Sequence, residues 1–334
     1  MEISSSHVGV QKHTDTDQNR FDIPRFVALS SGTEFGHYQD AQWSFLLSGS
    51  EISTFTMKAE IEADAITKKE DSRFGGCVLS VAFDTADATI GLGMVLVDPK
   101  HRRKGIARQL IRAAMDAHTT SASHPRFILA VCSEMGHPLY RSLGFQEVGV
   151  VHAMVCPMKA LRRYAKSCDK HRFRCISTEN TCETRGFIYK LDKLATGYDR
   201  RERLDLLLRA EYASDAFARI VIGFDKHGDS VSCTPSSFAI LRQESPSGPL
   251  IVGPMVGPPE SALPLVCHIS QQQFLDEKSS LSILVSNHKD DVVNKLMQVA
   301  GFRVAWAGPS MSSDAKPIYR DEGLYLALMH PTLG

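Results

Sequence analysis

Basic side chains gather around one glycine in residues 97–110 (VDPKHRRKGIARQL), although the chain as a whole has 38 basic and 38 acidic residues. The hydrophobic spacing predicts that a strand ends at Val97 and that a helix starts near Arg103. Cations at a helix N-terminus oppose its dipole by about 0.3–1 kcal/mol each. The amides there lack intrahelical acceptors, and Gly105 has no Cβ to keep an anion away. The stretch therefore predicts a phosphate or pyrophosphate site.

The elements that must position this stretch follow from the periodicity of the flanking residues. Strands are expected at 74–83 and 88–97, and the apolar positions of 106–115 recur at helical spacing. A continuous apolar run at 127–132 predicts a strand buried on both faces. The remaining expected elements are a helix around 41–47, a short helix at 137–143 closed by Gly144, and a strand at 148–155.

Strand 88–97 is expected to alternate between two faces. The first face carries Ile90, Leu92, Met94 and Leu96, and the second carries Gly91, Gly93, Val95 and Val97.

The second half of the chain shows a similar order of elements. We expect helices at 200–212 and 291–299, strands at 218–224, 237–243 and 281–285, and turns around Pro254 and Pro258. This similar order suggests that the chain contains two copies of one fold. The expected division is a flexible polar tail (1–22), a first domain (23–158), a basic linker (159–185) and a second domain (186–334).

Composition excludes several classes of protein. A net charge of +0 gives no reason to expect nucleic acid as a partner, and no apolar run is long enough to span a bilayer. The N-terminus lacks the apolar segment of a secretory signal, so a cytoplasmic protein with reduced thiols is expected. Cys168, Cys175 and Cys182 lie near His171, but zinc sites usually contain a close C-x-x-C pair, so no metal is expected.

Two motifs in the first half resemble those of the GCN5-related N-acetyltransferases (GNAT). Residues 102–107 (RRKGIA) are similar to the family's acyl-CoA-binding pattern R/Q-x-x-G-x-G/A, on the expected strand-to-helix turn. Residues 139–145 (LYRSLGF) are similar to the family's L-Y-x-x-L-G-F segment. In the second half, residues 192–200 (DKLATGYDR) and 251–254 (IVGP) resemble the C-terminal half of a YitH-like subgroup with two tandem acetyltransferase-like domains.

The resemblance implies an α/β (α+β) GNAT fold, with a mixed, mostly antiparallel sheet flanked by helices, in two tandem copies. It implies acetyl-CoA as cosubstrate, lying in a splay between two strands. Its pantetheine arm would pair near Leu96 and Val97, and Ser133 stands where the family often has an asparagine that contacts this arm. Its pyrophosphate would be bound by the turn that contains Arg102, Arg103, Lys104, Gly105, Ile106, Ala107 and Arg108.

The reaction implied is direct attack of a primary amine on the thioester in a ternary complex. Tyr140 matches the general acid of many members and would protonate the CoA thiolate; the alternative is a packed tyrosine. Glu134 is the base we select, with His137 and His152 as further candidates, although each can be an ordinary polar residue and some members use ordered water.

The second half lacks the acyl-CoA pattern, and Met297 occupies the position of Tyr140, counted back from Gly301. This half is expected either to complete the acceptor pocket or to cover the sheet of the first. An inactive acyl-CoA-binding regulator is the alternative function. A third possibility is that KHRRK is a nuclear-import or nucleic-acid patch, but no aromatic residues interleave with it. The sequence does not identify the acceptor, which is a small-molecule or protein amine. It is compatible with either a monomer or a homodimer.

Overall fold

The fold was obtained as a computed structural model. It describes residues 10–14, 22–33, 38, 40–49, 51–58, 74–83, 88–119, 124–166, 173–177, 182–209, 217–226, 233–243, 250–272, 279–286, 290–321 and 323–330. Chain contacts divide it into two compact units, residues 1–128 and 129–334. Cys168 and His171 lie outside the described residues. None of the described helices is long and apolar enough to cross a membrane.

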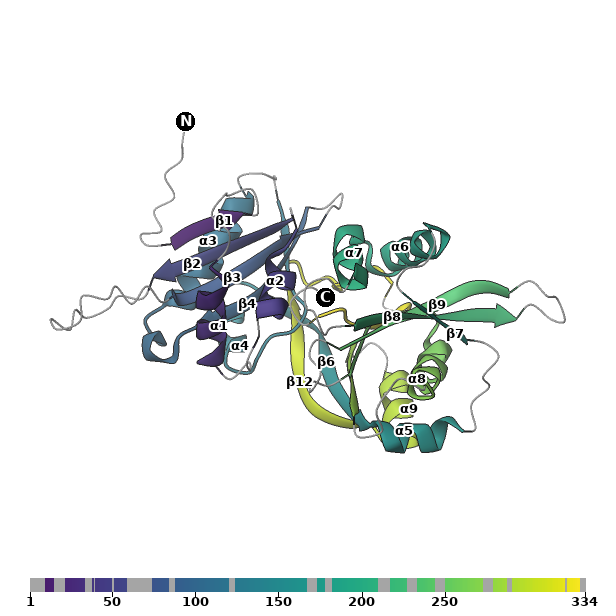
Figure 1. Ribbon diagram of the computed structural model, residues 1–334. Helices are drawn as coiled ribbons and strands as arrows, with labels where there is room; N and C mark the ends of the chain where they lie inside the picture. The colour runs from purple at the N-terminus through teal and green to yellow at the C-terminus, as the bar shows by residue number, and fades with distance from the viewer. Residues whose placement is uncertain are drawn as a thin grey trace. The chain divides into compact units, whose positions relative to one another are not determined.

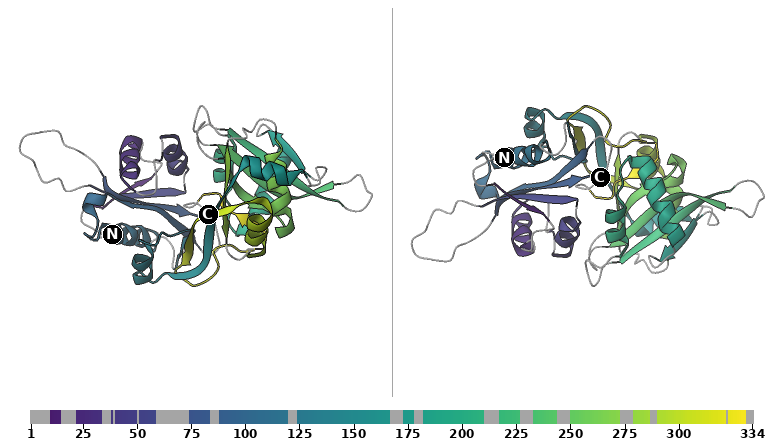
Figure 2. Two further views of the ribbon diagram at one scale, coloured as in Figure 1. Left: turned by 90° about the horizontal axis from the view of Figure 1, so that it is seen from below. Right: turned by 90° about the horizontal axis from the view of Figure 1, so that it is seen from above.

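Unit 1 contains a sheet in the order β1-β2-β3-β4-β5, antiparallel except for the parallel pair β4–β5. Helices α1 and α2 cover one face and α3 the other (Figures 1 and 2). The elements are β1 (Val10–Thr14), α1 (Ile23–Ser31), α2 (Asp40–Leu47), β2 (Ile52–Lys58), β3 (Phe74–Ala82), β4 (Thr89–Val97), the 3₁₀ helix η1 (Pro99–His101), α3 (Ile106–Thr119) and β5 (Arg126–Leu129).

Strand β1 corrects the prediction that residues 1–22 are a flexible tail, because five of these residues belong to the sheet. Val10–Thr14 pairs antiparallel with β2, with Val10 opposite Met57. The sequence VQKHT has no strong apolar alternation, so its strand conformation comes from pairing at the sheet edge. His13 Nε2 lies 3.0 Å from Thr56 Oγ1 on the neighbouring strand, and this contact supports the register.

The apolar face of α3 fixes how this helix lies on the sheet. Its buried side chains are Ile106, Leu110, Ile111, Ala113 and Ala114. Gly76 on β3 makes the close approach possible. A Cβ at Gly76 would lie 2.8 Å from the Leu96 carbonyl oxygen and 3.0 Å from Ile106 Cγ2. The sequence therefore sets the start of α3 directly above the end of β4.

Unit 2 contains the strand order β12-β6-β11-β13-β10-β9-β8-β7, in which β10 and β11 are parallel. Helices α6 and α7 lie on one face of the β8–β9 sheet, and α5, α8 and α9 on the other (Figure 1). The elements are α4 (His137–Ser142), β6 (Gln146–Pro157), α5 (Met158–Ala165), β7 (Phe173–Ser177), α6 (Cys182–Thr196), α7 (Arg201–Arg209), β8 (Phe217–Lys226), β9 (Cys233–Gln243), β10 (Leu250–Val256), η3 (Pro259–Ser261), α8 (Ala262–Ser270), β11 (Ser280–Ser286), α9 (Asp290–Ala300), β12 (Arg303–Ser312) and β13 (Tyr325–Ala327).

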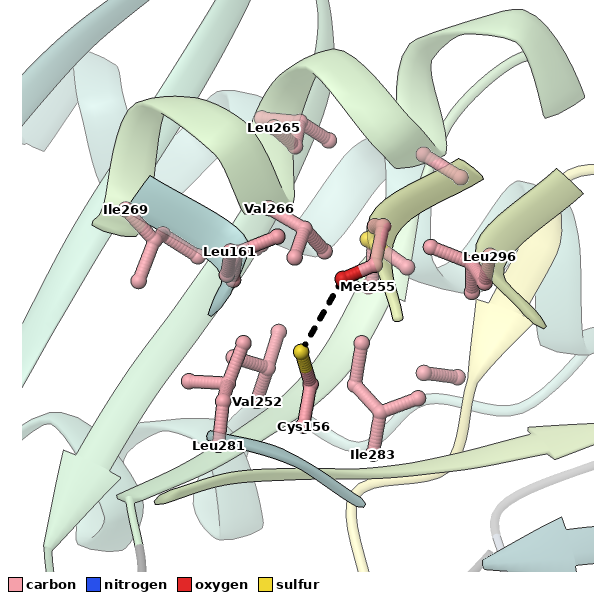
Figure 3. Close-up of a cluster of buried hydrophobic side chains, with 14 of the residues drawn as sticks. Cys156, Leu161, Val252, Met255, Leu265, Val266, Ile269, Leu281, Ile283 and Leu296 are labelled. Carbon is pink, nitrogen blue, oxygen red and sulfur yellow. Dashed lines mark hydrogen bonds between the residues drawn. The ribbon is translucent and has the colours of Figure 1, made fainter. Parts of the chain in front are cut away.

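The core of unit 2 corrects the prediction that residues 159–185 form a basic linker. Met158–Ala165 is an amphipathic helix, and its Leu161 is fully buried in the cluster shown in Figure 3, together with Cys156 and Ile283. On the polar side of α5, Arg162 Nε donates to the Ser270 carbonyl at 2.7 Å. Basic residues therefore surround a buried apolar stripe, which the overall charge of the segment obscured.

The two halves repeat the same series of elements. From β1 to β6 and from β7 to β12, each half runs strand, two helices, three strands, a 3₁₀ helix, helix, strand, helix, strand. Both tandem copies and the mixed, mostly antiparallel sheet are therefore confirmed. The predicted turns around Pro254 and Pro258 were wrong in part, because Pro254 lies inside β10 and Pro258 directly precedes η3.

The last strands of the two copies are exchanged. Strand β6 of the first copy pairs along its length with β11 and β12 of the second. Residues that follow β5 bond to β12 in turn: Cys132 N donates to the Pro309 carbonyl at 2.9 Å, and Ser310 Oγ donates to the Ala130 carbonyl at 2.7 Å. This exchange explains why the compact units divide at residue 128 and not in the predicted linker.

Candidate functional site

The turn between β4 and α3 begins with a capped 3₁₀ helix. Asp98 is its N-cap, and the carboxylate accepts a hydrogen bond from Lys100 N at 2.8 Å. The predicted helix start near Arg103 was wrong, because α3 begins at Ile106. Arg103 and Gly105 both have positive φ, +66° and +79°, which is incompatible with a helix. Residues 102–105 are therefore a loop that leads into the helix.

This loop presents charge and an open backbone to solvent. The side chains of Arg103 and Lys104 are exposed, Arg102 is half-buried, and Gly105 is itself exposed. Among the described residues, a Cβ at Gly105 would have only Gln109 Nε2 within 4 Å, at 3.9 Å, so space is open beside the backbone. The first amides of α3, beginning at Ile106, point toward the same end. The geometry fits an anion with several oxygens, such as a pyrophosphate.

Strand β4, which leads into the turn, departs from simple alternation. Its register with β3 shifts between Cys77 and Leu79, and Met94 has φ +47°. This is a bulge, which bends a strand and re-aims the residues after it. The last residues, Leu96 and Val97, pair with β3 after the bulge. Leu96 is buried and Val97 half-buried.

Tyr140 lies in the second part of the predicted site, which belongs to unit 2. Its side chain is 6% exposed, and its ring meets that of Phe145 edge-on at 6.0 Å. Burial is the main cause that raises the pKa of the Tyr140 hydroxyl well above its usual value, and the nearby Cys132 adds to the effect. The phenol therefore keeps its proton at neutral pH, as a proton donor must.

Gly136 leaves space for the ring of Tyr140, a role that the sequence analysis did not predict. A side chain on a helix points back toward the N-terminus, so the ring of Tyr140 covers the residue four positions earlier. A Cβ at Gly136 would lie 2.8 Å from Tyr140 Cε2. The i, i+4 spacing of a glycine and a tyrosine is the signal that points to this contact.

Ser133 stabilises the turn that leads into the short helix that carries Tyr140. Its hydroxyl accepts from Gly136 N at 3.2 Å, and its carbonyl accepts from Gly136 N at 3.0 Å and from His137 N at 2.9 Å. These bonds satisfy amides at the start of α4. The structure thus gives Ser133 a role in positioning α4, beside the predicted contact to the cofactor arm, which stays a prediction.

The candidate bases have different surroundings. Glu134 is exposed in the turn before α4. His137 Nε2 lies 2.7 Å from Glu147 Oε1 on β6, a partner that sequence reasoning missed. His152 is half-buried in the middle of β6, opposite Val285 and Ala307, and its Nδ1 has no hydrogen-bond partner among the described residues. The predicted site residues therefore divide between the two units, with Leu96 to Arg108 in the first.

A family model described as "Acetyltransferase (GNAT) domain" matches residues 62–147. A UPF0039 protein of Schizosaccharomyces pombe is 34% identical over 59 residues, which are 18% of this chain and 39% of that protein. The matching stretch thus spans well under half of this curated relative. The family match lies within the first half of the chain.

Solved structures resemble the whole chain in fold. A putative acetyltransferase from Pyrococcus horikoshii superposes with a TM-score of 0.69 at 12% identity, over 100% of this chain and 99% of that one. A tandem GNAT protein from the clavulanic acid biosynthesis pathway gives 0.62 at 11% identity, over 92% and 99%. A GCN5-related N-acetyltransferase from Sphaerobacter thermophilus gives 0.55 at 10% identity, over 97% and 99%.

Proposed function

We propose that this chain, in which residues 62–147 match a GNAT acetyltransferase domain and whose fold resembles that of tandem GNAT proteins, transfers an acetyl group from acetyl-CoA to a primary amine. The turn between β4 and α3 is the observation that carries this proposal. It combines the exposed cations Arg103 and Lys104 with the open backbone at Gly105, directly before the N-terminus of a helix. These features suit the pyrophosphate of CoA, and they occur in the half that contains the family match.

The proposed reaction takes place in a ternary complex. The amine nitrogen attacks the carbonyl carbon of the thioester, a C–N bond forms, and the C–S bond breaks. CoA leaves as a thiolate and receives the proton of the buried Tyr140 hydroxyl, which is protonated at neutral pH. Solvent then restores the proton of the phenol.

The attacking amine must also lose a proton. We propose Glu134 as the acceptor of this proton, because its carboxylate is exposed in the turn before α4 and can pass the proton to solvent. His137 is the alternative base, and its bond to Glu147 would hold the ring in one orientation. The pH profiles of the acetylation rate in Glu134→Gln and His137→Gln separate the two candidates. The rate increases with pH as the base loses its proton, and only the variant that lacks the base should lose this increase.

Binding and turnover should be measured in sequence. Acetyl-CoA at about 100 times its dissociation constant should stabilise the protein by about 2.7 kcal/mol, seen as a rise in the melting temperature. A panel of amines, followed by thiol release, then tests transfer. Absence of stabilisation at millimolar acetyl-CoA contradicts the proposal. Stabilisation without acetylation of any amine favours an acyl-CoA-binding regulator.

A further inference from the structure

Strand β13 is the one described strand that has no counterpart in the first copy. In both copies the strand before the 3₁₀ helix pairs in parallel with the next strand through its first three residues only. Thr89, Ile90 and Gly91 of β4 pair with β5, and Leu250, Ile251 and Val252 of β10 pair with β11. Beyond these residues the two strands separate in both copies.

In the second copy, β13 lies between the separated strands. Met255 and Val256 of β10 pair antiparallel with Ala327 and Tyr325. On the other side Val285 of β11 pairs with Ala327. The ladder continues past both ends of β13, as Leu328 N donates to the Leu284 carbonyl at 2.9 Å and Gly257 N donates to the Leu324 carbonyl at 2.8 Å. The segment thus bonds to both edges of the splay.

Buried polar groups hold this segment in place. Arg242 is 1% exposed, and its guanidinium donates to the Gly253 carbonyl at 2.6 Å and to the Met329 carbonyl at 2.7 Å. The Tyr325 hydroxyl accepts from Arg200 Nη2 at 3.1 Å and from Met329 N at 3.1 Å. Hydrogen bonds from a buried cation are strong, so they anchor the segment at both ends.

The backbone of β10 is shaped for this neighbour. A Cβ at Gly253 would lie 2.0 Å from the Leu328 carbonyl oxygen, so only glycine allows the two chains to approach. Tyr325, Leu326 and Ala327 are each fully buried. The segment therefore packs between β10 and β11 as a ligand packs in a groove.

We propose that the splay of the second copy is a binding site for an extended peptide, filled in cis by residues 324–329 of the same chain. The strand is added through main-chain bonds on both sides, as in β-augmentation. It takes the position in which, under the proposed function, the first copy receives the arm of acetyl-CoA. The chain therefore has one donor site, and the second copy serves as a receptor for its own C-terminal strand.

Hydrogen exchange on the intact protein tests this inference. The amides of Leu328 and Met329 should exchange at least about 100-fold more slowly than those of an unstructured peptide, comparably to amides of β11. Acetyl-CoA should leave this protection unchanged. Exchange at the rate of a free terminus, or loss of protection when acetyl-CoA is added, would overturn the proposal.

A nicked protein tests whether the segment behaves as a ligand. A protease site inserted between the exposed residues Ala315 and Lys316 releases residues 316–334 from the covalent chain. The fragment should remain bound during gel filtration, and a synthetic peptide of the same sequence should exchange with it. The same peptide with Ala327→Pro, which blocks the ladder, should not. Separation of the fragment in native buffer, or equal exchange with both peptides, overturns the proposal.

The two tests are independent of acetyl transfer. If exchange and retention behave as expected while no acetyl-CoA binds, the proposed function fails and the peptide site stands. If acetyl transfer is found but the C-terminal amides are unprotected, the peptide site fails and the proposed function stands.

Discussion

The two strand-to-helix turns of this protein have the same elements and differ in the residues between them. In the first copy, η1 ends at His101 and α3 begins at Ile106, so residues 102–105 form a loop with three cations and a glycine. In the second, η3 ends at Ser261 and α8 begins at once at Ala262, with Glu260 in the turn. The fold supplies a helix terminus twice, but only one copy has a loop suited to an anion.

The helices α4 and α9, which precede β6 and β12, also differ between the copies. Tyr140 on α4 is 6% exposed, whereas Met297 at the matching position of α9 is 40% exposed. A buried phenol can meet a reacting group in a dry site, but an exposed thioether has no proton to give. The proposed acid–base chemistry therefore belongs to the first copy, and the following predictions test this proposal.

The largest effect is expected for Tyr140→Phe, which removes only the hydroxyl. The acetylation kcat should fall about 100- to 10,000-fold, the usual contribution of a general acid, while the Kd of acetyl-CoA changes little. Steady-state rates together with calorimetric titration separate the two quantities. Tyr164→Phe, at a half-buried tyrosine of α5, is the matched control. An unchanged kcat in Tyr140→Phe would show that the phenol is only a packed side chain.

The next effect concerns the space that Gly136 provides. In Gly136→Ala the new methyl group meets the Tyr140 ring, so the ring must shift, and kcat should fall about tenfold because small displacements of a catalytic group are costly. Gly186→Ala is the control, since the described residues place no neighbouring atom within 4 Å of its new methyl group and alanine favours helices. Equal kcat values in both variants would remove Gly136 from the positioning of Tyr140.

Two glycines with almost the same backbone angle sharpen the comparison of the turns. Gly105 (φ +79°) and Gly301 (φ +76°) both have open space beside them, so alanine strains each by a similar amount. Both variants should lose about 1 kcal/mol of unfolding free energy. Only Gly105→Ala should raise the Kd of acetyl-CoA, by about tenfold. If both variants bind acetyl-CoA alike, the loop is not the pyrophosphate site.

Removal of charge from the loop should have a smaller effect. The double variant Arg103→Ala and Lys104→Ala should raise the Kd of acetyl-CoA about three- to tenfold and weaken its dependence on salt, because exposed cations act through screened attraction. Lys159→Ala with Arg163→Ala removes two cations of α5 that lie far along the chain from the loop, and it should change neither quantity. A salt dependence that persists in the loop variant would argue against direct attraction of phosphate.

The sequence predicted the elements whose own pattern specifies them. Strands β3 and β4 and helices α3, α4 and α9 were located from apolar periodicity and from Gly144 and Gly301. Strands β1 and β7 were missed because both are sheet-edge segments whose conformation comes from pairing with β2 and β8. Strand β10 was read as a turn because Gly253 and Pro254 usually mark turns, whereas Gly253 here allows the approach of Leu328.

In the candidate site, too, the sequence indicates residues within one local element but not contacts between distant segments. Arg103, Gly105 and Tyr140 were proposed as site residues from motifs that lie within single local elements, and their roles stay predictions. Gly136 and Glu147 were missed, because their roles depend on which side chains meet in space. The strand exchange and β13 involve residues far apart in sequence, and no local periodicity reports such pairing.

The smallest effect compares two histidines near the ends of α3 and α8. Burial, with a smaller contribution from Lys12, lowers the pKa of His118 from 6.5 to about 4, and its Nε2 lies 2.9 Å from Ser80 Oγ. Burial also lowers the pKa of His268. Between these pH values the unfolded chain binds protons at the two histidines and the native protein does not. Their contribution to the free energy of unfolding is therefore fully present above about pH 6.5 and is lost as the pH falls toward 4.

This linkage gives a test in each copy. Between about pH 7 and about pH 5, wild-type protein should lose about 1 kcal/mol more unfolding free energy than His118→Gln, a figure reduced for the partial exposure of the ring. His268→Gln should show a difference of the same sign. Urea unfolding at the two pH values measures both. A wild-type protein that gains stability relative to His118→Gln on acidification would mean that the imidazole is protonated in the native state, and the structural correspondence of α3 and α8 would then not extend to their histidines.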